Sequence, residues 1–232
     1  MAEFKMSSVD QAPQTPGLYA WYVKFQAGSQ DWRIRPEGEV DGAIEGFLQL
    51  LTRYASYHAP LPIDLQGVGA YGARWRGHVE LDRPLQEELD GDELVMDKRL
   101  DAIRDTLASE GRRRVMAELL MAATPFFSSP LYIGVAENLR VRLQQHHRDF
   151  TDAYDWLLDH PEDAPLVKAK GKSFGQRAAA RGISMDTLVA WVLHFDADDA
   201  DIDAIMNSEI RRTAEAAEWV LHQLYSPILG KN

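Results

Sequence analysis

Two short apolar segments, each with a tyrosine close to a glycine, constrain the fold of this 232-residue chain more than any other feature. The first is Gly17-Leu18-Tyr19-Ala20-Trp21-Tyr22-Val23 and the second is Leu131-Tyr132-Ile133-Gly134. Both segments follow a proline and are rich in aromatic or β-branched side chains, so we predict that each forms a buried strand. Because residues 20 to 131 separate the two tyrosines, the sheet must join distant parts of the chain.

Hydrophobic periodicity predicts mainly helices between and after these strands. The expected helices cover residues 42–57, 94–110, 113–123, 139–150, 154–158 and 202–225. A hairpin is possible after the glycine-rich stretch 67–77, and the apolar run 187–195 predicts a third strand. The resulting order is strand, long insertion, strand, helices, strand and helix. It predicts an α+β fold in which helices cover a small sheet.

Composition excludes several classes of protein and site. The chain has no cysteine, which excludes disulfides, thiolate zinc sites and a cysteine nucleophile. No stretch approaches the roughly 20 apolar residues that span a bilayer. The first six residues contain no apolar run typical of a secretory signal. We therefore expect a soluble, cytoplasmic protein that does not bind a membrane.

The net charge of −11 argues against a general nucleic-acid coat, but the positive charges are concentrated in the second half. No acid lies between Asp163 and Asp186. The cations in this interval are Lys168, Lys170, Lys172, Arg177 and Arg181, and Arg140, Arg142 and Arg148 precede them. A local phosphate-binding surface would fit this segment, and a solvated run of charges fits it nearly as well.

The ordered set of Gly-Leu-Tyr at 17–19, Tyr-Ile-Gly at 132–134, Arg142, His146, Glu218 and Asn232 resembles the GIY-YIG nuclease superfamily. The resemblance implies a core of three antiparallel strands flanked by helices, built from residues 1–26 and 128–232. Residues 27–127 would then be a mostly helical insertion that serves specificity, dimerisation or regulation. Members of the family usually separate the two tyrosine motifs by about a dozen residues.

The resemblance also implies roles for the matching residues. Glu218 would hold a single Mg²⁺ or Mn²⁺ ion, and Arg142 would clamp the scissile phosphate of DNA, with RNA not excluded. Tyr19, Tyr132 and His146 would manage the attacking water, and Asn232 would close the site by hydrogen bonding. Arg140, Lys168, Lys170, Lys172 and Arg177 would contact the nucleic-acid backbone.

These residue types suit phosphodiester hydrolysis. A carboxylate can hold a hard divalent cation, and an arginine can stabilise charge that develops on phosphoryl oxygens. Tyrosine and histidine can transfer protons, although an unperturbed phenol has a pKa near 10. Glu209 and Glu215 compete with Glu218 as ligands, and His147 lies beside His146.

Two other function classes fit the same residues. A catalytically silent module with this fold could bind nucleic acid or a protein, which the acidic balance favours. Alternatively, the insertion could sense a ligand or partner and keep the nuclease inactive, or form a homodimer through helices 42–57 and 94–110.

Three further motifs carry no site in our interpretation. Gly67-Val68-Gly69-Ala70-Tyr71-Gly72 fits a dinucleotide-binding pattern but lacks the strand before it and the helix after it. The acidic stretch 196–203 lacks the glycine and glutamate of a calcium-binding loop. The run Arg112-Arg113-Arg114 predicts the polar face of a helix.

Overall fold

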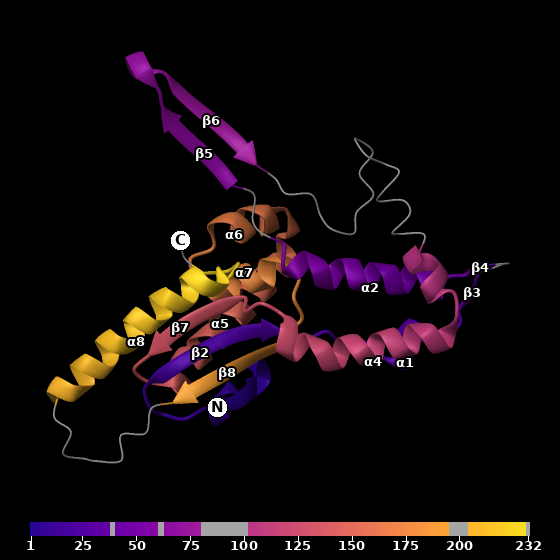
Figure 1. Ribbon diagram of the computed structural model, residues 1–232, viewed down its shortest axis with the longest axis horizontal. Coiled ribbons are helices and arrows are strands. Elements are labelled where there is room, and N and C mark those ends of the chain that lie inside the picture. Colours follow the sequence, from indigo (N-terminus) through magenta and orange to yellow (C-terminus); the bar gives the residue numbers. More distant parts are fainter. Residues whose placement is uncertain (38–39, 60–62, 80–101, 195–203, 231–232) are drawn as a thin grey trace. The chain divides into compact units, whose positions relative to one another are not determined.

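The computed structural model describes residues 1–37, 40–59, 63–79, 102–194 and 204–230, and its architecture is α+β (Figure 1). Contacts divide the chain into two compact units. Unit 1 comprises Met1–Lys24 and Thr124–Asn232, and unit 2 comprises Phe25–Ala123. In the part of the chain that is described, no helix is both long enough and apolar enough to cross a membrane.

Unit 1 contains a sheet with strand order β1-β8-β2-β7, and all its strand pairs are antiparallel. The strands are β1 (Ala2–Lys5), β2 (Gly17–Val23), β7 (Tyr132–Ala136) and β8 (Leu188–His194). The small sheet flanked by helices is confirmed, but it has four strands instead of three. The additional strand, β1, is a four-residue segment that pairs with the outer edge of β8.

Strand β2 lies between β7 and β8, so both of its edges are paired. Its side chains are buried alternately along the strand. Tyr19, Trp21 and Val23 are buried on one face of the strand. Trp21 lies opposite Tyr132 on β7 and opposite Ala190 on β8. The two tyrosine segments of the sequence are therefore neighbouring strands.

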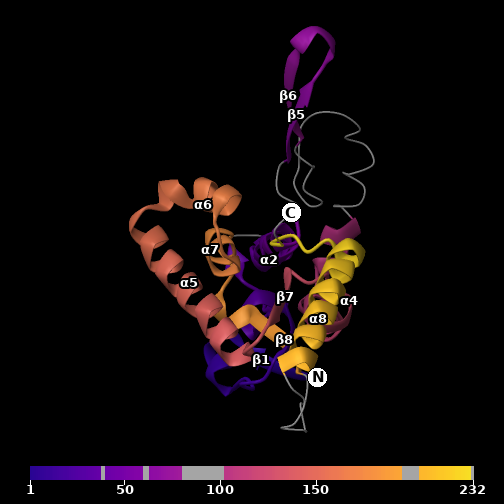
Figure 2. The ribbon, with the colours of Figure 1, turned by 90° about the vertical axis from the view of Figure 1, so that its left-hand side faces the viewer.

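Helices cover unit 1 on both sides of the sheet (Figure 2). Helix α5 (Leu139–Asp159) and helix α7 (Phe174–Ala180) lie on one side, and α8 (Ala204–Tyr225) lies on the other. The remaining helical elements are η1 (Met6–Gln11), η3 (Pro161–Asp163), α6 (Ala164–Lys170) and η4 (Met185–Thr187). Helix α5 runs without a break through the segment where we expected a separate short helix, since its periodicity continues beyond Phe150.

The outer edge of β7 is protected by α8 and the residues that follow it. Nε2 of His222 lies 3.1 Å from the carbonyl oxygen of Ile133. The N–H of Leu229 donates to the carbonyl oxygen of Leu131 over 2.7 Å. These contacts occupy backbone groups that an edge strand would otherwise present for pairing with another chain.

Unit 2 contains helices and two small hairpins. Its elements are α1 (Ser29–Trp32), β3 (Pro36–Glu37), β4 (Val40–Asp41), α2 (Ala43–Tyr57), β5 (Ile63–Val68), η2 (Ala70–Gly72), β6 (Arg74–Val79), the helical residues 102–107 and the start of α4 (Glu110–Phe127). The helix predicted at 42–57 is confirmed as α2. Helix α4 extends beyond both ends of the helix predicted at 113–123, because it includes both Gly111 and Pro125.

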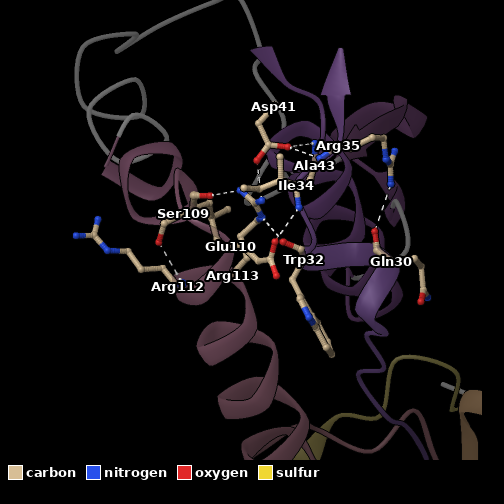
Figure 3. A network of polar contacts seen from close by, with 11 residues as sticks. Gln30, Trp32, Ile34, Arg35, Asp41, Ala43, Ser109, Glu110, Arg112 and Arg113 are labelled. Atoms are coloured by element: carbon tan, nitrogen blue, oxygen red, sulfur yellow. Dashed lines mark hydrogen bonds and ion pairs between the residues drawn. The ribbon is translucent and has the colours of Figure 1, made fainter. Parts of the chain in front are cut away.

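A buried arginine links the elements of unit 2 (Figure 3). The side chain of Arg113 is fully buried near the core of Phe47, Leu107 and Ala117. Its Nη2 donates to Oδ2 of Asp41 over 2.7 Å, and Nη1 donates to the carbonyl oxygen of Leu107 over the same distance. Its Nε donates to the carbonyl oxygen of Trp32 over 2.9 Å. The interpretation of residues 112–114 as a polar surface is therefore wrong for Arg113.

Asp41, the partner of Arg113, also organises the start of α2. Its Oδ1 accepts from the backbone N–H groups of Arg35, over 2.9 Å, and Ala43, over 3.0 Å. Burial alone would raise the pKa of the Asp41 carboxyl, but these two N–H groups and the Arg113 guanidinium lower it overall. The carboxylate therefore stays ionised and joins α2, the β3–β4 hairpin and α4.

Replacing Arg113 by alanine should destabilise unit 2 by about 3 kcal/mol, because the Asp41 carboxylate and two carbonyl groups would lose a charged partner. Arg114→Ala is the matched control, since Arg114 is exposed and pairs with Glu118 along the helix surface. It should leave the unfolding free energy nearly unchanged, because an exposed ion pair contributes little to stability. Denaturant unfolding measures both values, and similar losses in the two variants would contradict a structural role for Arg113.

Candidate active site

The hydroxyl of Tyr19 is the centre of a polar network in unit 1 that runs from the exposed Arg142 to the buried His146. Tyr19 is only 2% exposed. Its oxygen lies 2.8 Å from Nε2 of His146, and Nε of Arg142 donates to it over 3.2 Å. Because an arginine nitrogen can only donate, the phenol oxygen accepts from Arg142 and is free to donate its own proton to His146. The network therefore has a direction, from Arg142 through Tyr19 to His146.

Helix α5 brings Arg142 and His146 to the same tyrosine. The side chain of Asn138 accepts from the N–H of Val141 over 3.1 Å and so caps the first turn. Leu139 and Leu143 are fully buried against the sheet, which fixes the rotation of the helix. Residues four apart lie on one helix face, so Arg142 and His146 both reach Tyr19.

Tyr132 lies beside Tyr19 on the neighbouring strand, and Gly134 makes room for the pair. The two rings have centroids 6.0 Å apart and planes inclined by 29°. A Cβ on Gly134 would lie 2.5 Å from the Tyr19 oxygen and 2.9 Å from Cε1 of Tyr132. The absence of a side chain at Gly134 therefore lets the Tyr19 hydroxyl cross β7 toward α5.

Glu218 on α8 faces the same region from the other side of β7. Oε1 of Glu218 lies 3.8 Å from Nε2 of His222. Burial raises the pKa of Glu218 above its usual value, and Glu215 adds to this effect. The nearby His222, a hydrogen bond from the Val135 N–H and the charge of Arg142 oppose the rise. Glu218 is thus electrostatically coupled to Arg142 although the two residues lie on different helices.

The charge states at the network follow from burial. Burial raises the pKa of Tyr19, and the neighbouring Tyr132 raises it further, while Arg142 opposes the rise. Burial lowers the pKa of His146 to about 3, with smaller contributions from the positive charges of Arg142 and Arg177. His146 is therefore neutral near pH 7, Tyr19 is protonated and Arg142 is charged.

The donor set suits a hard divalent cation held by one carboxylate. Within the described residues, no group of three or more His, Asp or Glu side chains could hold a metal ion by itself. Mg²⁺ does not require such a group, since it keeps several waters and binds one or two carboxylates together with substrate phosphates. The partly buried carboxylate of Glu218, close to a charged arginine, fits such a single ligand.

The residues predicted to contact a nucleic-acid backbone lie in different environments. Nε of Arg140 donates to the carbonyl oxygen of Ala12 over 2.7 Å. Arg177 is only 8% exposed, and its Nη2 donates to the carbonyl oxygen of Leu229. Lys168 and Lys170 lie in the last turn of α6, and Lys172 lies just after it.

The structure does not describe the side chains of every candidate. Asn232 lies outside the described residues, as does the acidic stretch 196–203, and the side chain of Glu209 is also outside them. Glu215 is exposed on α8, and His147 is half-buried next to His146.

Two neighbours of the network, Phe174 and His222, were not among the residues predicted from the sequence. Phe174, on α7, is buried, and its ring contacts Trp21 at a centroid distance of 5.2 Å and His146 at 5.5 Å. A capping box of Ser173 and Gln176 begins α7 and was a signal for this helix. His222 lies one turn after Glu218, and that spacing was the available signal for it.

No family model, curated protein or solved structure matches this chain.

Replacing His146 by glutamine should reduce the acid sensitivity of the fold. The pKa of about 3 lies below the ordinary 6.5, so the unfolded chain binds a proton between these values and the folded chain does not. The unfolding free energy should fall by about 2 kcal/mol between pH 6.5 and pH 5 because of this residue. His146→Gln should remove that part of the fall in unfolding free energy. Denaturant unfolding of both proteins at the two pH values measures it. An identical pH dependence in both proteins would contradict a buried neutral His146.

Gly134→Ala should destabilise unit 1 by about 1–3 kcal/mol, because the added methyl group would overlap the hydroxyl of Tyr19. Gly111→Ala is the control, since a Cβ there meets nothing within 4 Å and Gly111 lies inside α4. That change should stabilise the protein by about 0.5–1 kcal/mol. Thermal and denaturant unfolding distinguish the two outcomes, and a neutral Gly134→Ala would show that the close approach is not required.

Proposed function

We propose that this protein is a metal-dependent endonuclease of the GIY-YIG type that hydrolyses phosphodiester bonds in DNA. The observation that carries this proposal is the network in which Arg142 donates to Tyr19 and Tyr19 contacts His146. These residues come from two motifs separated by more than half the chain, and each matches a position in the ordered set that resembles the family. Packing alone would not require a phenol, an arginine and a histidine at one point.

The arrangement of unit 1 supports the same proposal. The two tyrosine strands are antiparallel neighbours, and the helix after the second strand supplies Arg142 and His146. Helix α8 follows the last strand and supplies Glu218. The fourth strand β1 and the long unit 2 are departures from the minimal core that the resemblance implies.

In this proposal, the residues of the network share two tasks. The Arg142 guanidinium turns toward a non-bridging oxygen of the scissile phosphate and stabilises the charge that develops there. Tyr19 accepts a proton from the attacking water as its own proton passes to Nε2 of His146. The water oxygen bonds to phosphorus while the bond to the leaving oxygen breaks, and that oxygen takes a proton from solvent. Glu218 would hold a divalent cation, which would supply further positive charge at the scissile phosphate.

Substrate binding would make His146 a better base. The positive charge of Arg142 lowers the pKa of His146, second in importance to burial. A phosphate paired with Arg142 neutralises that charge and adds a negative charge nearby, so the pKa of His146 rises. The free protein therefore keeps His146 neutral, and the substrate itself favours its protonation during the reaction.

A second candidate is a silent module with this fold that binds nucleic acid without cutting it. The nearly complete burial of Tyr19 favours it, because water must reach that hydroxyl for catalysis. In this case, the polar network would serve only to align α5 with the sheet.

Cleavage of supercoiled plasmid with Mg²⁺ distinguishes the two functions. Arg142→Ala and Glu218→Gln should each slow cleavage by roughly 100-fold or more, since each removes a charge that acts in the transition state. Glu215→Gln is the matched control on α8 and should leave the rate within a few-fold. Equal activity in wild type and the two site variants would reject the assignment, and metal-independent binding without cleavage would favour the silent module.

A further inference from the structure

Unit 2 presents an exposed hairpin, formed by β5 and β6, that the proposed active site does not use (Figure 1). The turn between its strands is η2. Three large apolar side chains of this hairpin are exposed, namely Val68, Tyr71 and Trp75. From Gly67 to Gly77 the sequence contains Arg74 and Arg76 and no acidic residue, although the whole chain carries a charge of −11. The hairpin is thus a local aromatic and cationic surface on an acidic protein.

The tyrosine at the tip has an unfavourable backbone conformation. Tyr71 has φ of 62° and ψ of 23°, in the left-handed region, and its side chain is fully exposed. Bulky residues rarely adopt this conformation, and glycine would adopt it without strain. Neither burial nor backbone preference explains a tyrosine at this position. A role for the exposed ring outside the fold would explain it.

The indole of Trp75 is held flat against the opposite strand. Trp75 lies opposite Gly67 in the register, and a Cβ on Gly67 would overlap the indole ring. One face of the indole therefore rests on the glycine backbone, while 53% of the residue stays exposed. A ring fixed in this way offers its other face for stacking at little further cost in side-chain entropy.

The arginines lie on both sides of the tryptophan along β6. Arg74 and Arg76 are exposed, and successive strand residues alternate between faces, so both lie on the face opposite Trp75. Asp64, the acid of β5, pairs in register with His78 at the open end of the hairpin, away from η2. The tip therefore combines planar rings with positive charge. This combination binds single-stranded nucleic acids, whose bases stack on aromatic rings while arginines pair with phosphates.

We propose that the β5–β6 hairpin binds a DNA strand with unpaired bases that runs along the outer edge of β6. Its bases stack on Tyr71 and Trp75, and its phosphates contact Arg74 and Arg76 from the other face of the hairpin. The inference rests on the proposed function in taking a nucleic acid as substrate, and it deepens that function by assigning recognition of unpaired bases to unit 2. An intact duplex hides the faces of its bases, so it should bind this surface more weakly than a single strand does.

Fluorescence anisotropy with a labelled single-stranded oligothymidine tests the proposal. The full chain carrying Glu218→Gln is used with a chelator, so that no strand is cut. Adding Tyr71→Gly should weaken binding by roughly 5-fold or more, the effect of losing one stacked base. The melting temperature should stay equal or rise, since glycine relieves the backbone strain at this position. If Tyr71 had only a structural role, its loss would lower the melting temperature. Weaker DNA binding with an unchanged or higher melting temperature would therefore indicate direct contact with DNA.

The arginine pair is tested in the same assay by varying salt. Arg74→Ala with Arg76→Ala should reduce the slope of log K against log salt by about 1.4, which corresponds to two phosphates of a single strand. Arg33→Ala with Arg53→Ala is the control, since it removes two exposed arginines from other elements of unit 2. The control should leave the slope and the affinity unchanged.

Three results would overturn the inference. They are unchanged binding in the Tyr71 variant, equal effects of the hairpin and control arginine pairs, and an intact duplex that binds as tightly as the single strand. A hairpin variant that alters the oligomeric state in sedimentation without altering DNA binding would identify a second copy of the chain as the partner, and would also overturn it.

Plasmid cleavage separates this inference from the nuclease proposal. If the protein binds DNA through the hairpin but never cleaves it, the inference stands and the nuclease proposal is rejected. Cleavage that depends on Glu218 in a protein whose binding ignores the hairpin would retain the nuclease and reject the inference.

Discussion

The pairing of β2 on both of its edges is the constraint on which the rest of unit 1 depends. Tyr19 has Gly134 on one side and Val192 on the other, so three distant segments of the chain meet at this residue. A one-residue slip in the register would turn Tyr19 and Trp21 to the opposite face of the sheet. The buried positions of β2 therefore specify which face α5 covers, and the polar network follows from that choice.

The network at Tyr19 combines stabilising hydrogen bonds with one buried nitrogen of His146 that makes none among the described residues. The phenol hydrogen-bonds on both sides, which offsets much of the cost of burying it. Nδ1 of His146 is buried without a hydrogen-bond partner among the described residues. An unpaired buried nitrogen of this kind costs about 1–3 kcal/mol. A core selected for stability alone would place a hydrocarbon ring at this position, so stability alone does not explain the histidine.

Sequence patterns predicted the parts of the molecule that depend on local order. The strand containing Tyr19, the strand containing Tyr132 and the inner face of α5 follow from short apolar patterns, as does helix 42–57. Arg113 was misassigned because its burial depends on Asp41, a partner 72 residues away that no local pattern reveals. β1 was missed because four residues paired at an edge carry almost no periodicity. Sequence spacing selected both Glu218 and Arg142 as candidates. Their electrostatic coupling could not be predicted, because it depends on how the two helices lie in space.

The interposed position of unit 2 has a consequence for synthesis of the chain. Trp21 pairs with Tyr132 and with Ala190, so the central strand β2 leaves the ribosome long before either neighbour. About 100 residues separate β2 from β7. At about 5–20 residues per second, their synthesis takes roughly 5–20 s. Unit 2 can complete its own contacts in that interval, because they lie within Phe25–Ala123. The length of unit 2 therefore sets the shortest time for which β2 stays unpaired during synthesis.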